Sequence, residues 1–238
     1  MGRIWAVCSG SGGVGKTTVA LSLAVYAAKA GWQTIYLDAS GAARCADLAL
    51  GMQNVISLDM ADVASQQVAL QAALYPVPHV EGLRFACASL YDGTMLDELS
   101  GVLLALHSLC DLLVMDLPAG CGWLGRGVLC GRDRLIAVLR PDDASIRSTE
   151  RMMSVTDSGE AERSLILCRV SRMLMRQGIQ YEQDAVRMTL DYPVIGVVPE
   201  DEGIPIAAAK GRLATECDGP AGKALRGIAS ELLGSERI

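Results

Sequence analysis

A glycine-rich segment that directly follows an apolar run constrains the fold of this chain more than any other feature. Residues 9–18 read SGSGGVGKTT, which contains the pattern G-x-x-x-x-G-K-T, and the apolar run Ile4–Cys8 precedes it. Glycines let consecutive backbone N–H groups turn inward around phosphates, a lysine neutralises phosphate charge, and a threonine hydroxyl can bind Mg²⁺. The segment therefore predicts a phosphate-binding loop and a nucleoside triphosphate as its ligand.

The residues that follow this loop favour a helix. Thr17–Lys29 is rich in alanine and leucine, and Gly31, a residue type that commonly ends helices, comes shortly after it. Bound phosphates would then lie at the positive N-terminal end of the helix. The residues that we expect to contact the nucleotide here are Gly10, Ser11, Gly12, Gly13, Val14, Gly15, Lys16, Thr17 and Thr18.

Short apolar runs alternate with helical patterns along the rest of the chain. The runs are apolar throughout, rather than at every second residue, which is typical of parallel strands covered by helices on both faces. The sequence thus predicts an α/β fold with a doubly wound, mostly parallel sheet. The expected strands are Arg3–Cys8, Thr34–Asp38, Leu83–Ala88, Leu112–Asp116, Leu135–Leu139, Leu165–Arg169 and Val194–Val198.

Composition points to a single domain over residues 1–238. The chain is 51% hydrophobic, which is enough for one large core, and no Pro/Ser-rich linker or internal repeat divides it. Its net charge of −6 argues against electrostatic binding of nucleic acid over a broad surface. The sequence has no stretch of about 18 apolar residues, and its N-terminal apolar run is too short for a signal peptide. We therefore expect a cytoplasmic protein.

Two expected strands end in aspartate, at Asp38 and Asp116. Ligands of such sheets bind at the carboxyl ends of the strands, and Mg²⁺ prefers oxygen ligands and retains water. We therefore predict that Thr17 binds Mg²⁺ directly, that both aspartates bind it through water, and that Lys16, Asp38 and Asp116 are the catalytic candidates. The alternative is that the aspartates only cap the turns that follow the strands.

The eight cysteines do not form a C-x-x-C pair. Cys8, Cys87 and Cys168 fall in strand-like apolar runs, so we expect buried, reduced thiols there. Cys121 and Cys130 are the only pair worth weighing as ligands of a metal or cluster at a subunit interface, and their wide spacing favours ordinary core or loop thiols.

Five ordered segments together resemble the MinD/ParA group of P-loop ATPases, and their spacing matches its MinD branch best. Residues 41–51 and 219–234 also resemble that branch, so the likeness covers nearly the whole chain. The five segments are SGSGGVGKTT, YLDAS, MDLPAG, RPDDASIRSTERM and IGVVPED.

This resemblance implies a switch that binds ATP or ADP with Mg²⁺ and forms a homodimer around two ATP molecules. In that state such proteins recruit protein partners of a positioning system, in division-site placement or in polar or flagellar localisation, and hydrolysis releases them. By the same resemblance, Arg169, Pro199, Glu200 and Asp201 flank the adenine. The asparagine that the family commonly has after the strand at 165–169 is absent, and residues 199–201 are equally interpretable as a structural turn.

Two departures from the family pattern affect hydrolysis. The family usually has a lysine at the position of Ser11, which reaches the phosphates held by the second subunit, and a water-orienting aspartate at the position of Ser40. Phosphoryl transfer depends mainly on positioning and charge stabilisation. We therefore predict nucleotide binding with slow or partner-dependent ATP hydrolysis, unless a nearby group such as Arg44 or Arg126 replaces the missing lysine.

Other members of the superfamily offer alternatives. A ParA-like DNA-segregation ATPase would need a basic dimer surface, which the acidic charge balance disfavours. A metal-insertion or cluster-carrier ATPase would need a closely spaced cysteine pair. The chain ends in GSERI, without the basic amphipathic helix of MinD-like proteins, so we expect membrane contact only through a partner or through a longer natural C-terminus.

Overall fold

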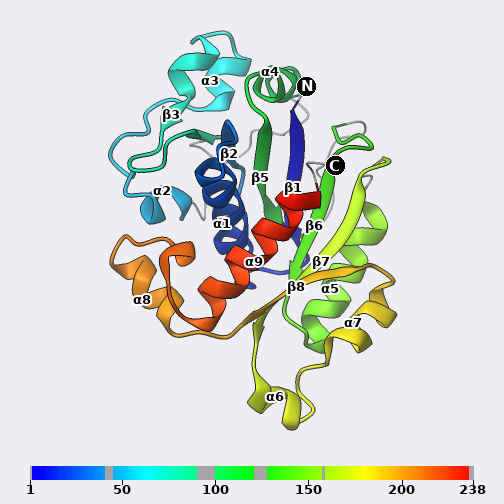
Figure 1. Cartoon of the computed structure of the whole chain (residues 1–238). Helices are drawn as coiled ribbons and strands as arrows, with labels where there is room; N and C mark the ends of the chain where they lie inside the picture. The colour runs from blue at the N-terminus through cyan, green and yellow to red at the C-terminus, as the bar shows by residue number, and fades with distance from the viewer. Residues whose placement is uncertain (1, 41–44, 90–99, 121–127, 157–158, 236–238) are drawn as a thin grey trace.

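An eight-stranded sheet runs through the computed structural model, which describes residues 2–40, 45–89, 100–120, 128–156 and 159–235 (Figure 1). The strand order is β3-β4-β2-β5-β1-β6-β7-β8, and every neighbouring pair is parallel except β3 and β4. The strands are β1 (Arg3–Ser9), β2 (Thr34–Asp38), β3 (Tyr75–Pro76), β4 (Leu83–Cys87), β5 (Leu112–Ala119), β6 (Arg134–Leu139), β7 (Glu162–Val170) and β8 (Val194–Pro199).

The predicted fold class and all seven predicted strands are confirmed, with ends that shift by a few residues. Sequence analysis missed β3, a two-residue edge strand that pairs antiparallel with β4. A strand this short has no measurable hydrophobic period, and proline at its second position is unfavourable except at the edge of a sheet.

Helices join the strands and cover the sheet. Among the described residues they are α1 (Lys16–Lys29), α2 (Ala46–Ala49), α3 (Met60–Ala64), α4 (Ser100–Ser108), α5 (Asp143–Val155), α6 (Arg172–Arg176), α7 (Gln183–Leu190), α8 (Gly203–Ala209) and α9 (Pro220–Ser235), with 3₁₀ turns η2 (Leu70–Ala73) and η4 (Ala214–Glu216). The predicted helix after the glycine-rich loop is α1, and Gly31 follows its C-cap with φ 92°.

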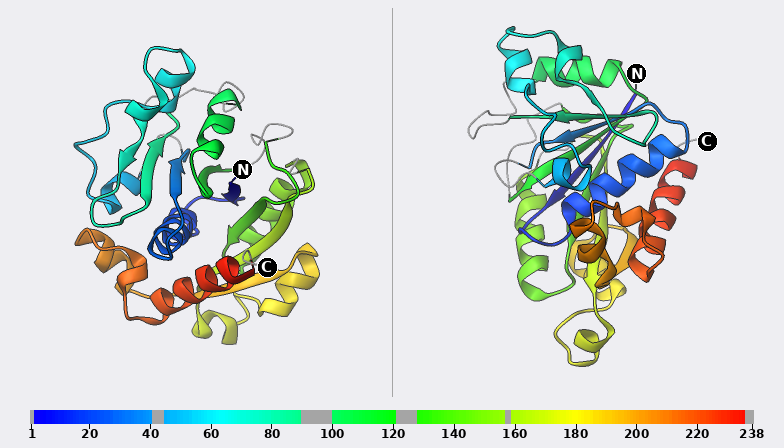
Figure 2. Two further views of the ribbon diagram at one scale, coloured as in Figure 1. Left: turned by 45° about the horizontal axis from the view of Figure 1, so that its top comes forward. Right: turned by 90° about the vertical axis from the view of Figure 1, so that its left-hand side faces the viewer.

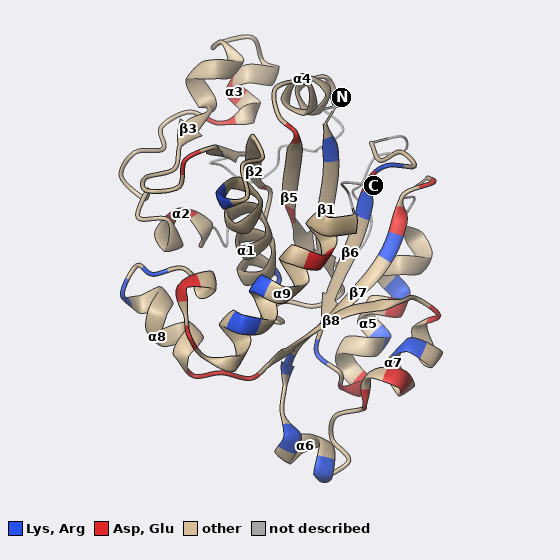
Figure 3. Ribbon diagram, in the orientation of Figure 1, with Lys and Arg blue, Asp and Glu red and all other residues tan. Residues whose placement is uncertain are grey.

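The sheet is buried on both faces, each against its own hydrophobic core. Trp5, Val7 and Tyr36 pack with residues of α1 and α9, whereas Ile4 and Ala6 face the opposite way and pack with residues of α4, α5 and α7. Figure 2 shows α1 and α9 on one side of the sheet and α4 and α5 on the other. Charged residues lie mainly in helices, loops and strand ends (Figure 3). Burial on both faces explains why the strands are apolar throughout.

The parallel arrangement brings the carboxyl ends of β1, β2 and β5 to one edge of the sheet. In the register of β2 and β5, Asp38 lies opposite Asp116, and Val7 of β1 lies opposite Asp116 on the other side. The glycine-rich loop leaves β1 at this edge, so the fold brings the loop and both aspartates together. Within the described part of the chain, no helix has both the length and the apolar character needed to cross a bilayer.

Candidate functional site

The glycine-rich loop joins β1 to α1 and has the backbone geometry that a phosphate cradle requires. Gly13 and Gly15 adopt φ angles of 72° and 103°, in the left-handed region that side chains other than glycine rarely tolerate. Gly15 is the N-cap of α1, and it makes no side-chain capping hydrogen bond to this helix end. The first-turn N–H groups and the helix dipole therefore favour an anion at the loop.

Gly10 is required for a different reason, which is close packing against α5. A Cβ atom at this position would lie 2.3 Å from the carbonyl carbon of Ser148 and 2.4 Å from its oxygen. By contrast, a Cβ atom on Gly12 would meet no described atom within 4 Å. The start of the loop is thus fixed against the backbone of α5, and its outer part is open.

Lys16 forms a buried ion pair at the centre of the site. Its Nζ lies 2.6 Å from Oδ1 of Asp116, and the two side chains are 10% and 0% exposed. The hydroxyl of Tyr36 donates a hydrogen bond of 2.9 Å to Oδ2 of Asp116. Burial, followed by the charge of Asp116, raises the pKa of Tyr36 well above its usual value of 10.0, which keeps the phenol a hydrogen-bond donor.

Tyr36 is a site residue that sequence analysis missed. It lies two residues before Asp38 and therefore on the same face of β2, next to Asp116 on β5. The alternation of side chains along β2 would have revealed this contact only if the order of the strands had been known.

Asp38 is buried beside Asp116 and has an unsatisfied oxygen. Its Oδ1 accepts hydrogen bonds from the backbone N–H of Ser40 at 3.0 Å and from the Ser40 hydroxyl at 2.6 Å. Its Oδ2 is buried and has no hydrogen-bond partner among the described residues. Burial raises the pKa of Asp38 above its usual 3.8, against the opposing hydrogen bonds from Ser40. A cation or its water would satisfy this oxygen.

These groups fit a magnesium ion that retains water. Thr17 is in the first turn of α1, at the edge of the sheet where Asp38 ends β2 and Asp116 lies opposite it on β5, which continues to Ala119. The described residues contain no cluster of three or more His, Cys, Asp or Glu side chains that could hold a metal by themselves. Magnesium in this position would therefore take phosphate and water oxygens as well as the Thr17 hydroxyl, with Asp38 and Asp116 nearby.

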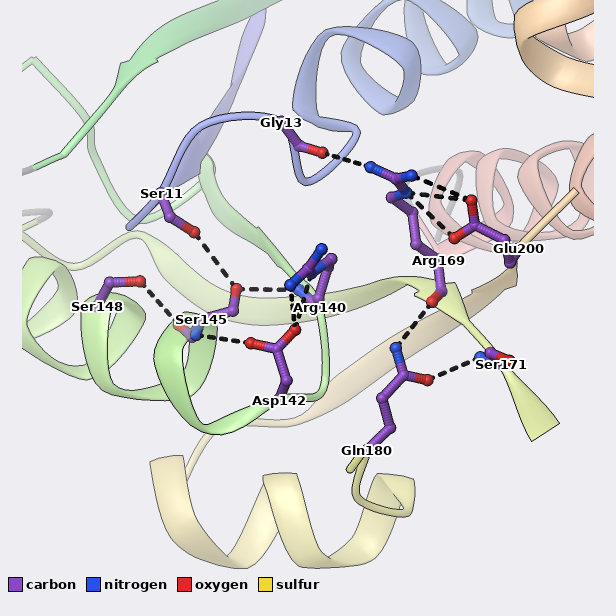
Figure 4. A network of polar contacts seen from close by, with 10 residues as sticks. All are labelled: Ser11, Gly13, Arg140, Asp142, Ser145, Ser148, Arg169, Ser171, Gln180 and Glu200. Atoms are coloured by element: carbon purple, nitrogen blue, oxygen red, sulfur yellow. Dashed lines mark hydrogen bonds and ion pairs between the residues drawn. The ribbon is translucent and has the colours of Figure 1, made fainter. Parts of the chain in front are cut away.

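Two of the residues predicted to flank the base contact each other, and one of them also contacts the phosphate loop. Arg169, at the end of β7, donates from Nε and Nη2 to Glu200 at 3.1 and 3.2 Å. Its Nη1 donates to the carbonyl oxygen of Gly13 at 3.1 Å (Figure 4). The hydrogen bonds to Glu200 raise the pKa of the Arg169 guanidinium above its usual value. The structure thus links the loop directly to the segment that follows β8.

Pro199 and Asp201 have structural surroundings of their own. Pro199 ends β8. The Asp201 Oδ1 accepts from the N–H of Gly203 at 2.8 Å, and its Oδ2 accepts from the N–H of Ala221 at 3.1 Å, at the start of α9. Both carboxylate oxygens are used within the fold, in agreement with the interpretation of this segment as a structural turn.

The two serines that replace family residues have different neighbours. The Ser11 Oγ lies 3.5 Å from the Oγ of Ser145 on α5, and Ser40 is bonded to Asp38 as described above. The proposed substitutes for the missing lysine, Arg44 and Arg126, lie outside the described residues.

The cysteines predicted in strands are buried. Cys8, Cys87 and Cys168 lie in the core, and burial raises the pKa of the Cys8 and Cys168 thiols to about 12. Such thiols stay protonated and unreactive at neutral pH. Cys130 is exposed, and Cys121 lies outside the described residues.

A pocket of about 160 Å³, which sequence analysis also missed, lies beside α1. It extends from Thr17 and Thr18 along the helix to Val25, and residues of α2, α8 and η4 enclose it. Its formation depends on the packing of segments far apart in the sequence, so no local pattern could have revealed it.

Known nucleotide-binding proteins resemble this chain in sequence. The family model described as the CobQ/CobB/MinD/ParA nucleotide-binding domain matches residues 5–214. An uncharacterized ATP-binding protein of Methanocaldococcus jannaschii is 33% identical, over 97% of this chain and 88% of that protein. The septum site-determining protein MinD of Helicobacter pylori is 30% identical, over 99% of this chain and 92% of that protein.

Solved structures share the fold. The MinD chain of a MinC:MinD cell division complex from Aquifex aeolicus superposes with a TM-score of 0.82 at 24% identity, over 98% of this chain and 96% of that one. MinD of Pyrococcus horikoshii, solved with Mg-ADP, superposes with a TM-score of 0.81 at 23% identity, over 100% and 99% of the two chains.

Proposed function

Because the chain belongs to the CobQ/CobB/MinD/ParA family of nucleotide-binding domains, we propose that it is a MinD-like switch controlled by ATP. In this proposal it binds ATP and Mg²⁺ at the phosphate loop, forms a homodimer in that state, and recruits protein partners. Hydrolysis to ADP, which is slow or depends on a partner, ends the state.

The observation that carries the proposal is the arrangement of charges around the loop. Lys16 and Asp116 form a buried pair, and the unsatisfied Oδ2 of Asp38 lies in the same edge of the sheet. Phosphates would engage Lys16 and the N-terminal N–H groups of α1. Magnesium would neutralise phosphate charge. Thr17 would bind the ion directly, and Asp38 and Asp116 would bind it through water.

Weak hydrolysis follows from Ser40. A hydroxyl at this position carries no charge, and its proton is directed to Asp38 at 2.6 Å. It is therefore a poor substitute for a carboxylate that accepts a hydrogen bond from attacking water. Among the described residues, the site keeps groups that would bind the nucleotide, and position 40 offers no carboxylate to orient the attacking water.

The base of the nucleotide would lie on the side of the loop where Arg169 meets Glu200. Their ion pair and the hydrogen bond to Gly13 place this segment beside the phosphate loop. Backbone groups near Pro199 and Asp201 would form hydrogen bonds to the base, since the Asp201 carboxylate is already hydrogen-bonded within the fold.

The cellular role that we propose is placement of the division site or a related positioning task. The support is that relatives from several bacteria are septum site-determining MinD proteins and that one similar structure is a MinD bound to MinC. Contact with a membrane would then be peripheral and would depend on a partner.

Phosphate release, measured with saturating Mg-ATP, tests the catalytic part of the proposal. We expect the wild type to release phosphate slowly, a Ser11→Lys, Ser40→Asp double variant to release it faster, and a Lys16→Ala control to be inactive. Rapid release by the wild type would show that other residues replace the missing pair and would contradict slow turnover. Failure of the double variant to exceed the wild type would contradict the role given to the two serines.

A further inference from the structure

Three described cations near the phosphate loop are each paired with a carboxylate. Lys16 pairs with Asp116, Arg169 with Glu200, and Arg140 with Asp142. We propose that Arg140 is a second phosphate-binding cation, which exchanges Asp142 for the terminal phosphate of ATP and so supplies the charge that Ser11 lacks. This inference rests on the proposed nucleotide-binding function and names a residue with no role in it so far.

Arg140 lies beside the start of the phosphate loop. It directly follows β6, and its backbone N–H donates to the Oγ of Ser145 at 3.1 Å. The same Oγ is 3.5 Å from the Oγ of Ser11. A single hydroxyl group therefore separates the backbone of Arg140 from the side chain at position 11. Figure 4 shows the dashed contacts from Arg140 to Ser145 and from Ser145 to Ser11.

The guanidinium group of Arg140 is only partly engaged. Its Nε and Nη2 approach the same oxygen, Oδ2 of Asp142, at 2.8 and 2.7 Å. A guanidinium has five N–H donors, so this contact leaves others for a phosphate. The side chain is 44% exposed, and water weakens ion pairs of this kind. Phosphate oxygens match the planar guanidinium at least as well as a carboxylate does.

The other two cations are held more firmly. Lys16 contacts a carboxylate that is fully buried. Arg169 uses Nε and Nη2 for Glu200 and Nη1 for the carbonyl oxygen of Gly13. Of the three cations, Arg140 can therefore exchange its carboxylate for another anion at the lowest cost in free energy.

Asp142 does not need Arg140 to stay in place. Its Oδ1 accepts a hydrogen bond of 3.0 Å from the N–H of Ser145 and caps the N-terminus of α5. The carboxylate thus has a structural role of its own on one oxygen and holds the arginine on the other. When Arg140 moves to a phosphate, Asp142 remains fixed at the helix end.

The competing interpretation is that the Arg140–Asp142 pair only stabilises the turn before α5. That role predicts a small change in stability on removal of the arginine and no change in nucleotide affinity. Affinities for a non-hydrolysable ATP analogue and for ADP, each with Mg²⁺, distinguish the two interpretations and can be measured by titration calorimetry on the full chain.

For Arg140→Gln we expect about tenfold weaker binding of the ATP analogue, as for loss of one hydrogen bond to a charged group, and little change for ADP. Arg151→Gln, which removes an exposed arginine farther along α5, is the matched control and should bind both nucleotides like the wild type. Asp142→Asn retains a good helix cap and removes the competing charge, so it should bind the ATP analogue more tightly.

A double-mutant cycle tests whether Arg140 replaces the cation missing at position 11. When added to the Arg140→Gln variant, Ser11→Lys should restore its affinity for the ATP analogue. The same substitution should raise the affinity less in the protein that still has Arg140. Wild-type affinity of Arg140→Gln, an equal loss for both nucleotides, or no rescue by Ser11→Lys would each overturn the inference while the proposed function stands. A wild-type protein that binds neither nucleotide would contradict both.

Discussion

At the scale of single residues, Asp38 and Asp116 lie opposite each other on β2 and β5 but differ in their partners. Asp116 has Lys16 and the Tyr36 hydroxyl, whereas the Oδ2 of Asp38 has no hydrogen-bond partner among the described residues. Burial raises the pKa of Asp38 above 3.8. A carboxyl group whose pKa is higher in the folded state stabilises the fold while it is protonated, and this contribution is lost as pH rises through the folded-state pKa.

We therefore predict that Asp38→Asn is more stable than the wild type at pH 7 and that the difference disappears near pH 3.8 and below. The same variant should lose Mg²⁺-dependent nucleotide affinity, because it loses a carboxylate next to the metal. Urea denaturation at several pH values measures the stability. Lower stability of Asp38→Asn at pH 7 would contradict the argument.

Asp116→Asn provides the contrast, since it removes the charge that balances Lys16. Loss of one partner from a buried ion pair costs about 3–5 kcal/mol. We expect this variant to be destabilised by an amount of that order in the same denaturation experiment. A neutral effect would mean that Lys16 finds another partner or reaches water.

At the scale of secondary structure elements, the contact between the phosphate loop and α5 decides which loop glycines the fold itself requires. A Cβ on Gly10 would overlap the backbone of Ser148, whereas a Cβ on Gly12 would have no neighbour within 4 Å in the described part of the chain. We predict that Gly10→Ala lowers the free energy of unfolding by about 1–3 kcal/mol through overpacking. Gly12→Ala should change it by about 0.5 kcal/mol or less. Urea denaturation of the two alanine variants checks this, and equal stability would contradict the packing argument.

The sequence predicts these elements well where its signals are local. Strands such as Leu112–Asp116 are continuous apolar runs that end in aspartate, and the glycines of the loop precede a clear helical pattern. The contact of Tyr36 with Asp116 depends on which strands are neighbours and in what register. The proximity of Arg140 to Ser11 depends on how α5 packs against the loop. No local pattern contains such information, which is why sequence analysis missed both.

At the scale of the whole molecule, the phosphate loop follows the carboxyl end of β1, whereas the first and last described elements begin and end on the opposite side of the sheet. β1 begins at Arg3, at the amino end of the sheet's parallel strands, and Ser235 at the end of α9 lies 3.4 Å from Arg134 at the start of β6 (Figure 1). We predict that a fusion at either end leaves affinity for the ATP analogue unchanged, because the fused part does not approach the site. Titration of both fusion proteins measures this, and a loss of affinity in either would contradict it.

Light scattering after size exclusion tests the central claim, that nucleotide state controls assembly, most directly. Wild-type protein would be run with Mg²⁺ and either a non-hydrolysable ATP analogue or ADP, next to Lys16→Ala under the same conditions. We predict twice the chain mass for the wild type with the ATP analogue, the chain mass with ADP, and the chain mass for Lys16→Ala with both. One mass for the wild type under all conditions would contradict the claim of an ATP-dependent switch.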